Sequence, residues 1–431
     1  MCPAPPIDQD AIRSGPQGGQ LAICVIGRAR SAHVAARATC FAKMGHKVHL
    51  VTDERSVEGI SGVTEHTPGL EASSSGALAR RVLSPALTAL GIPPRAFFQL
   101  VGLIRFLQRH RPDIVHVHYA HGTYAWLAGL IGARPLVVSV MGGDILFDEQ
   151  GAHNALSRWM TLELLRQADY ITSKSHFLTA VLDRLGGFGQ KAERIVWGVP
   201  LGEFKRKDAS RLRARLGLAE KHRVILSPRI LQPLYRIHLI IEAIPLILRD
   251  IPDAVILVTE YLADMTYQAQ IIERVRSLGV ESHVIFCGEV KQQDMPELYS
   301  LAEISVGVPV SDGLPQTLFE AMACGTPTML SRLPRYEEIV QHEYSAYFVD
   351  ATPEAIAAGV IRLLRDPELR ATIAHNGLQI VARDANFEQE SRRVLQRYRV
   401  LVAEVPSRVL DVPRLWSRWQ SYRRSRAAIC V

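Results

Sequence analysis

The same sequence pattern occurs twice along the chain and limits its possible fold more than any other feature. Short apolar, β-branched runs alternate with longer helical segments on both sides of residues 197–208, where Gly, Pro and charged residues interrupt the alternation. This alternation predicts a parallel sheet of βα units in each half. We therefore predict an α/β protein with two Rossmann-like domains that face each other across a cleft. Its ligand site should lie beyond the carboxyl ends of the strands.

The strands predicted in the first half are Leu21–Ile26, Val48–Thr52, Ile114–His118, Leu136–Val140, Tyr170–Thr172 and Ile195–Trp197. Those predicted in the second half are Val224–Ser227, Ala254–Thr259, His283–Cys287, Ile304–Val308, Thr326–Leu330 and Ala346–Val349. The predicted parts of the chain are a disordered tail (1–20), a first Rossmann-like domain (21–200), a second Rossmann-like domain (201–385), a terminal helix that crosses back to the first domain (386–405) and a basic Arg/Trp tail (406–431).

Composition narrows the class of protein. With 48% hydrophobic and 22% charged residues, a mostly disordered chain is excluded. The sequence has no apolar run long enough to span a bilayer and no secretory signal, and its six cysteines show no CxxC spacing. Scattered cysteines are typical of a reducing compartment, so we predict a cytoplasmic protein.

Charge is concentrated in the tail. Residues 406–431 hold six arginines and one aspartate, which is +5 of the formal net charge of +7. The nearly neutral body excludes a nucleic-acid partner. Trp416, Trp419 and Tyr422 lie among these arginines, so both association with the inner face of a membrane and simple disorder stay open for the tail. The basic segment 95–111 has the apolar spacing of a helix that packs on the sheet.

The segment SDGLPQTLFEAMACGTP (311–327) follows an apolar run and predicts a strand-to-helix turn. Pro315 suits the first helical position, and Gly325 suits a left-handed helix end. Free N–H groups near Gln316 to Leu318 and the helix dipole would attract a diphosphate. Asp312 and Glu320, on either side of this helix start, are suited to accept hydrogen bonds from hydroxyls. A solvent-facing turn Asp and a surface Glu are the alternative.

A second anion anchor is predicted after the strand Val224–Ser227. Arg229 follows this strand, and its guanidinium could reach a diphosphate, with Arg236 as a second cation. Positive charge there would stabilise a bound diphosphate. Two solvated loop arginines are the alternative reading.

Metal and other catalytic motifs are incomplete in this chain. Asp8-Gln9-Asp10 lies in a Pro-rich tail rather than after a strand, and His116, His118 and His121 lack a completing ligand. We therefore predict no metal site, a buried His116 and a His118 at the end of its strand. No GxGxxG, GxxxxGK[ST], GxSxG or HExxH motif stands in a strand–helix context, which excludes the corresponding enzyme classes.

The segment 311–327 resembles the signature of the family-4 retaining glycosyltransferases of the GT-B architecture (glycosyl transferases group 1). In that signature an acid, seven residues and a Glu precede an AMACGTP-like helix end. Further similar segments follow in the family's order: SAHV (31–34), MGHKV (44–48), DIVHVHY (113–119), VSVMGGD (138–144) and WGVP (197–200). The chain departs from the family at Asp312, which is usually Glu, at Tyr235, which is usually Lys, and at Met141, which is often His.

This resemblance implies a metal-independent glycosyltransferase of the hexosyltransferase type with no cofactor. The sugar would pass with retention from a nucleoside-diphosphate sugar to a hydroxyl of a glycan or lipid-linked acceptor, in polysaccharide or glycolipid biosynthesis. The implied catalytic residues are Arg229, Asp312 and Glu320, with Glu320 on the ribose and Asp312 on the sugar hydroxyls. The implied donor-binding residues are Arg229, Arg236, Gly313, Leu314, Pro315, Gln316, Thr317, Leu318 and Glu320.

The first domain is expected to bind the acceptor through Gly27, Arg28, Ser31, His118, Gly143 and Asp144. Arg28 and Arg30 favour an acidic or phosphorylated acceptor, and solvated loop arginines are the alternative. Glycine at the end of a strand lets the backbone approach a ligand closely. A nucleotide-sugar-binding protein without transfer activity and a GT-B-type epimerase stay open as alternatives. So do the sugar, the base (UDP or GDP) and the acceptor.

Overall fold

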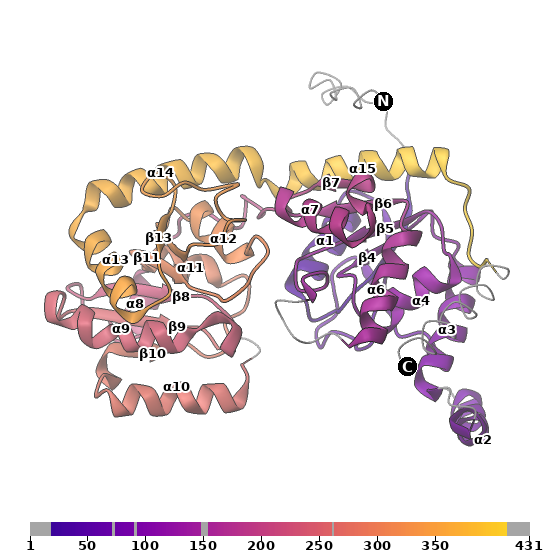
Figure 1. The fold of residues 1–431 in the computed structure, drawn as a ribbon, viewed down its shortest axis with the longest axis horizontal. Coiled ribbons are helices and arrows are strands. Elements are labelled where there is room, and N and C mark those ends of the chain that lie inside the picture. The colour runs from indigo at the N-terminus through magenta and orange to yellow at the C-terminus, as the bar shows by residue number, and fades with distance from the viewer. Residues whose placement is uncertain (1–18, 71–73, 90–92, 148–153, 261–262, 412–431) are drawn as a thin grey trace. The chain divides into compact units, whose positions relative to one another are not determined.

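The computed structural model describes residues 19–70, 74–89, 93–147, 154–260 and 263–411 (Figure 1). Its strands form two sheets, one of seven strands and one of six. By packing, one compact unit holds the described residues up to 139, 159–170 and those from 393 onward. The other holds the described residues of 140–158 and 171–392. The predicted basic tail lies outside the described residues from position 412 onward, as does the predicted N-terminal tail up to position 18.

The first sheet has the strand order β3-β2-β1-β4-β5-β6-β7. Its strands are β1 (Ala22–Ile26), β2 (Lys47–Val51), β3 (Val63–His66), β4 (Ile114–His118), β5 (Leu136–Ser139), β6 (Tyr170–Ser173) and β7 (Ala192–Arg194). β1 pairs in parallel with β2 on one side and β4 on the other. The order therefore reverses between β1 and β4, which is the place where open parallel sheets bind ligands.

The helices of the first half are α1 (Ala32–Lys43), α2 (Ser74–Ala89), α3 (Pro94–His110), α4 (Thr123–Ile131), α6 (Ala155–Gln167) and α7 (His176–Gly186). α3 buries Leu103, Phe106 and Leu107 along one face, as the apolar spacing of 95–111 predicts. No single described helix is long and apolar enough to cross a membrane. Residues 81–89 and α3 would pass that test only as a sharply bent pair.

The second sheet repeats the same order, β10-β9-β8-β11-β12-β13. Its strands are β8 (Arg223–Ser227), β9 (Ala254–Val258), β10 (Val284–Phe286), β11 (Ile304–Gly307), β12 (Thr328–Ser331) and β13 (Tyr347–Val349). β8 pairs in parallel with β9 and with β11. The switch point of this sheet therefore lies between the carboxyl ends of β8 and β11.

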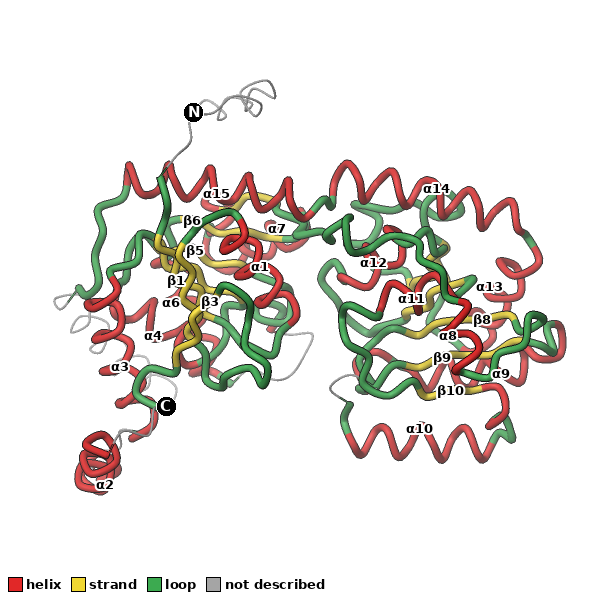
Figure 2. Tube along the Cα trace, turned by 180° about the vertical axis from the view of Figure 1, so that it is seen from behind, coloured by secondary structure: helices red, strands yellow, loops and turns green. Residues whose placement is uncertain are grey.

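Neighbouring residues of each strand in the second sheet point to opposite faces and build two cores. On β8, Leu226 packs in one core and Ile225 in the other. The Leu226 core contains residues of α8 (Ser210–Arg215), α11 (Met295–Leu301), α12 (Gln316–Ala323) and α14 (Pro367–Asp384). The Ile225 core contains residues of α9 (Ile237–Asp250), α10 (Met265–Ser277) and α13 (Pro353–Arg365) (Figure 2).

The predicted fold class is confirmed, and all six strands predicted in the second half are present. Two predictions in the first half were wrong. β3 was missed because its sequence, VTEH, has no apolar run. The last strand is β7 at Ala192–Arg194, and not the predicted Ile195–Trp197. The side chains of Ile195–Trp197 are buried, but they follow the end of the strand, and the backbone turns at Trp197 with a φ of 52°.

The terminal helix α15 (Phe387–Glu404) spans the predicted segment. Its Glu390 accepts a hydrogen bond from the backbone N–H of Val196 at 3.1 Å. Further along, the Tyr398 ring lies 5.7 Å from the Phe41 ring, and its hydroxyl bonds Nδ1 of His116. The Tyr398 contacts agree with the grouping of α15 from residue 393 onward with the unit that holds the described residues up to 139, whereas Glu390 and Val196 both belong to the other unit. The cleft between the two domains stays a prediction.

Candidate active site

Two loops at the switch point of the second sheet, together with the start of α12, carry most of the predicted donor residues. Arg229 follows β8, and Ser311 to Pro315 follow β11. α12 begins at Gln316 after Pro315, which takes the N-cap position rather than the first helical one as predicted. The helix ends at Ala323, and Gly325, just after the C-cap residue Cys324, has the predicted left-handed φ of 69°. A parallel pairing brings both loops to the same edge of the sheet.

Arg229 lies at the centre of this edge and is 8% exposed. Its Nη2 donates to Asp312 Oδ2 at 2.5 Å, and its Nη1 donates to Thr317 Oγ1 at 3.0 Å. The guanidinium carbon lies 4.3 Å from the centre of the Tyr235 ring, a cation–π contact. Burial alone would lower the pKa of Arg229, but Asp312, Tyr235 and Tyr336 raise it above its ordinary value. Arg229 therefore stays charged and is held on three sides.

Tyr336 closes the other side of the Asp312 carboxylate. Its ring is fully buried, and its hydroxyl donates to Asp312 Oδ2 at 3.2 Å. Burial first, and then the negative charge of Asp312, raise the pKa of Tyr336 well above its ordinary value. Asp312 therefore accepts from two buried donors at once, and its position is fixed by both.

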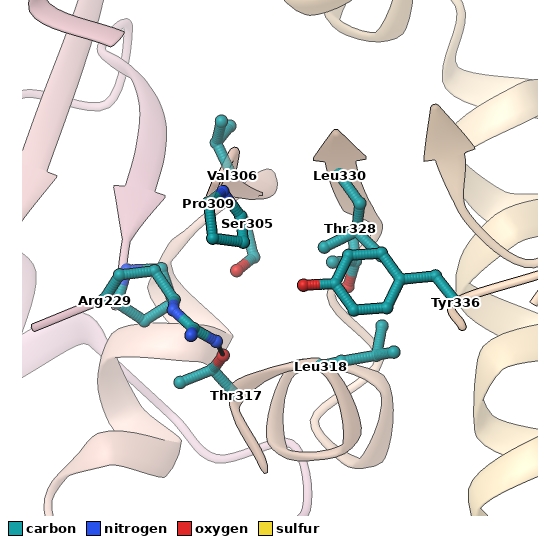
Figure 3. A pocket seen from close by; sticks show the side chains of 11 residues that line it. Arg229, Ser305, Val306, Pro309, Thr317, Leu318, Thr328, Leu330 and Tyr336 are labelled. Atoms are coloured by element: carbon teal, nitrogen blue, oxygen red, sulfur yellow. Dashed lines mark hydrogen bonds between the residues drawn. The ribbon is translucent and has the colours of Figure 1, made fainter. Parts of the chain in front are cut away.

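A small cavity of about 10 Å³ lies beneath Arg229, with Arg229 and Thr317 on one side and Tyr336 on the other (Figure 3). The hydroxyls of Ser305 and Thr328 contribute to its lining. This volume is about the minimum that holds one water molecule. The cavity is too small for a sugar or a nucleotide.

Glu320 lies on α12, one helical turn after Thr317, and is 4% exposed. Oε2 accepts from the Tyr299 hydroxyl at 2.8 Å, and Oε1 accepts from the Gln292 amide nitrogen at 2.7 Å. Burial raises the pKa of Glu320, and these two hydrogen bonds oppose that shift. The alternative of a solvent-facing surface Glu is therefore wrong for Glu320, since this carboxylate is buried and held by two donors.

The remaining predicted donor residues contribute in different ways. The side chains of Leu314 and Leu318 are each 1% exposed and belong to the core. The N–H of Leu318, predicted to be free, instead donates to the Pro315 carbonyl at 3.2 Å. The Gln316 amide donates to the carbonyl of Gly198 at 2.6 Å. Arg236 takes the N-cap position of α9 with a φ of 51°. Burial lowers the pKa of the neighbouring His238, and the charge of Arg236 adds to that shift. The group that stacks on Arg229 is instead Tyr235, its neighbour in the chain.

The predicted acceptor residues of the first domain lie in two places. Gly27, Arg28 and Ser31 follow β1, and His118 ends β4, so these four flank the switch point of the first sheet. Arg28 is exposed, whereas Arg30 pairs with Glu54 at 2.5 Å. A Cβ on Gly27 would lie 2.9 Å from a methyl carbon of Val34, so glycine lets α1 approach this strand end.

The turn after β5 holds the other two predicted acceptor residues, Gly143 and Asp144. Asp144 is fully buried, and its Oδ1 accepts from the N–H groups of Met141 at 3.0 Å and Gly142 at 2.9 Å. This carboxylate therefore holds the turn together, with Gly142 at a φ of 121°. An acceptor contact by Asp144 stays a prediction.

The two strand histidines belong to a buried polar network. Arg37 Nη1 and His118 Nδ1 are 2.8 Å apart, and the rings of His116 and His118 lie 4.1 Å apart. His116 is also hydrogen-bonded to Ser139 Oγ, at 2.8 Å, and to Tyr398. Burial lowers the pKa of both histidines well below the ordinary value, so both are neutral at physiological pH. Within the described residues, no group of three or more His, Cys, Asp or Glu is arranged to hold a metal ion.

Sequence reasoning missed four residues of the second-domain site. Tyr336, Tyr299 and Gln292 were not singled out, and Tyr235 appeared only as a departure from the family. The available signal was weak. A buried tyrosine needs a partner for its hydroxyl, but the sequence does not say which one.

Two family models match the chain in succession. Residues 31–203 match the model described as Glycosyltransferase Family 4, and residues 208–379 match Glycosyl transferases group 1. Together they span most of the chain and meet at the predicted boundary between the two halves. The chain therefore belongs to the glycosyltransferases of these families and is an enzyme with the GT-B architecture of two Rossmann-like domains.

Curated relatives are similar at about a quarter of aligned positions. N-acetyl-alpha-D-glucosaminyl L-malate synthase of Bacillus anthracis is 26% identical over 305 residues, covering 69% of this chain and 76% of the relative. D-inositol 3-phosphate glycosyltransferase of Segniliparus rotundus is 26% identical over 369 residues, covering 79% of this chain and 78% of the relative.

Solved structures share the fold at lower identity. Anabaena Alr3699/HepE in complex with UDP-glucose has a TM-score of 0.73 and 17% identity, covering 89% of this chain and 100% of that one. Sucrose-phosphate synthase of Thermosynechococcus elongatus has a TM-score of 0.72 and 19% identity, with the same coverage.

Proposed function

We propose that this glycosyltransferase is retaining and metal-independent, with a nucleoside-diphosphate sugar as donor. The observation that carries the proposal is the position of Arg229. It is a buried cation at the switch point of the donor sheet, bonded to Thr317 in the first turn of α12. An arginine and a helix N-terminus together offer donors to a diphosphate and stabilise the charge that develops on it as it leaves. A metal ion is then not needed for that role.

The two carboxylates would serve the rest of the donor. Glu320 would accept hydrogen bonds from the ribose, and Asp312 from hydroxyls of the transferred sugar, as the resemblance implies. Asp312 is bonded to Arg229, so the sugar site and the diphosphate site would be directly linked. HepE, a neighbour in fold, has been solved with UDP-glucose, which supports a nucleotide-sugar donor here.

We further propose an anionic acceptor that bears a free hydroxyl. Arg28 is exposed after β1, and the described residues give it no ion-pair partner. The names of two relatives specify L-malate and D-inositol 3-phosphate, and both of these are acids. A phosphorylated glycan or a lipid-linked phosphate would fit the same cation, in polysaccharide or glycolipid synthesis. A cytoplasmic enzyme at the inner face of the membrane, with no nucleic-acid partner, is consistent with that chemistry.

The first experiment is calorimetric binding of UDP and of GDP, each with and without EDTA, to the wild type and to Glu320→Ala. We expect micromolar, EDTA-insensitive binding of one nucleotide that is lost in Glu320→Ala. Binding should be kept in Glu354→Ala, which removes an exposed acid at the start of α13. No binding of either nucleotide to the folded wild type would refute the proposal.

Turnover assays separate transfer from its rivals. The binding nucleotide, charged with glucose, N-acetylglucosamine or mannose, is incubated with L-malate, inositol phosphate and sugar phosphates. Product with the donor's anomeric configuration, read by NMR, supports retention, and inverted product contradicts it. Epimerised donor without acceptor would favour the epimerase, and binding without any turnover would favour a nucleotide-sugar-binding protein. Arg28→Ala should raise KM for the acid acceptor and leave donor KM unchanged.

A further inference from the structure

The loop between β10 and α11 places an uncharged side chain over the buried carboxylate of Glu320. Gln292 lies in this loop and is exposed, yet its amide nitrogen donates to Glu320 Oε1 at 2.7 Å. Tyr299, on α11, holds the other carboxylate oxygen at 2.8 Å. Each carboxylate oxygen has a second lone pair, so Glu320 can still accept further hydrogen bonds.

The orientation of the Gln292 amide follows from chemistry. An ionised carboxylate only accepts hydrogen bonds, so the NH₂ group of Gln292 must face Glu320 and its carbonyl oxygen must face away. In the part of the chain that the structure describes, nothing donates to that carbonyl oxygen. Because Gln292 is exposed, the oxygen is open to a ligand. Gln292 thus adds a second, exposed acceptor to the Glu320 carboxylate that its NH₂ group bonds.

This acceptor pair lies one helical turn from the proposed diphosphate site. Thr317, which bonds Arg229, and Glu320 are three residues apart on α12 and so share a face of the helix. In a nucleoside diphosphate the ribose hydroxyls follow the phosphates at a comparable separation. A vicinal diol offers two donors, and an acceptor pair is its complement.

We propose that Gln292 is a specificity-determining residue that reads the ribose diol together with Glu320. One hydroxyl donates to Glu320 and its neighbour donates to the Gln292 amide oxygen. The enzyme therefore discriminates against deoxyribonucleotides, and Gln292 carries part of that discrimination. The inference rests on the proposed function, because it assumes a nucleoside-diphosphate donor on Arg229.

The test compares a nucleotide with its deoxy forms. Calorimetry measures Kd for UDP, 2′-deoxy-UDP and 3′-deoxy-UDP, or the GDP series if the wild type prefers it. The proteins are the wild type, Gln292→Ala, Gln292→Met and Gln293→Ala. Gln293 is the matched control, an exposed glutamine next in the same loop whose side chain does not contact Glu320.

The expected result is a change in the ratio of the Kd of a deoxynucleotide to the Kd of UDP, and not only a change in the affinity for UDP. Gln292→Ala and Gln292→Met should bind UDP about tenfold more weakly, the scale of one lost hydrogen bond. Both variants should bind one of the two deoxynucleotides almost as tightly as the wild type does. The ratio of its Kd to the Kd of UDP should therefore fall by the same factor. Gln293→Ala should keep the wild-type ratio, and circular dichroism should show all variants folded.

Three outcomes would overturn the inference. Unchanged ratios in both Gln292 variants would mean that the loop does not read the diol. Tighter UDP binding in Gln292→Ala would mean that Gln292 is a cover which the donor displaces. Failure of the folded wild type to bind any nucleotide would remove the proposed function and the inference with it, whereas in the first two outcomes nucleotide binding remains and only the inference falls.

Discussion

Asp312 pairs with Arg229, the cation on which the donor diphosphate would bind. Loss of the Asp312 charge should therefore strengthen nucleotide binding rather than weaken it. The Arg229–Asp312 pair joins side chains that are only 9% and 15% exposed, with nitrogen and oxygen 2.5 Å apart. A diphosphate that approaches Arg229 must compete with this carboxylate and is also repelled by it. Asp312→Asn keeps the shape and one acceptor but removes the charge. We therefore expect this variant to bind UDP more tightly while it loses sugar transfer.

The size of the effect follows from the geometry. A hydrogen bond to a charged group contributes about 1.5–3 kcal/mol net, and a neutral one about 0.5–1.5 kcal/mol. Replacing the carboxylate by an amide thus weakens the competing bond by about 1–1.5 kcal/mol. That difference corresponds to about tenfold in Kd. Limited solvent access keeps the pair from being strongly screened, so the gain should persist at 0.15 M salt.

Calorimetry of UDP, or of GDP if that is the nucleotide bound, with wild type and Asp312→Asn measures this gain directly. Asp350→Asn is the matched control, because it removes the same charge from an exposed position after β13. It should leave Kd within about twofold, as expected for a screened surface charge. Weaker or unchanged nucleotide binding by folded Asp312→Asn would refute the reasoning and would assign Asp312 to the orientation of Arg229 instead.

Three further predictions concern stability. Because burial raises the pKa of Glu320, its contribution to stability is present below the ordinary pKa of a glutamate and is lost as pH rises through the folded-state pKa. The free energy of unfolding of Glu320→Gln, measured with urea, should therefore rise relative to that of the wild type between pH 4 and pH 7.5. Parallel pH profiles of the two proteins would contradict this. Tyr398→Phe leaves a ring nitrogen of buried His116 without its hydrogen-bond partner, so the free energy of unfolding in urea should fall by about 1–3 kcal/mol. A loss near zero would show that this hydrogen bond does not stabilise the fold. Gly198→Ala would put a Cβ 1.4 Å from the carbonyl oxygen of Ala385, so the melting temperature should fall sharply, and a wild-type value would show that this backbone contact is not fixed.

Part of the donor site was readable from the sequence because its signals are local. The turn from β11 into α12 is set by Pro315, by the apolar period of the helix and by Gly325, all within 17 positions of the chain. The fold class followed from the alternation of periods 2 and 3.6, which depends on neighbours in sequence. β3 escaped the same reasoning, because VTEH lacks the apolar run by which the other strands were recognised.

The partners of the charged groups were decided by the tertiary structure alone. Arg229 and Asp312 are 83 positions apart, Tyr336 is 24 beyond Asp312, and Gln292 is 28 before Glu320. A parallel sheet gathers the carboxyl ends of strands at one edge, but each side chain there has several candidate partners within reach. Which pairs form depends on packing and on where the loop before α11 lies. The sequence by itself therefore determined that Glu320 is an acid on this helix, and only the fold made it a buried acid held by Tyr299 and Gln292.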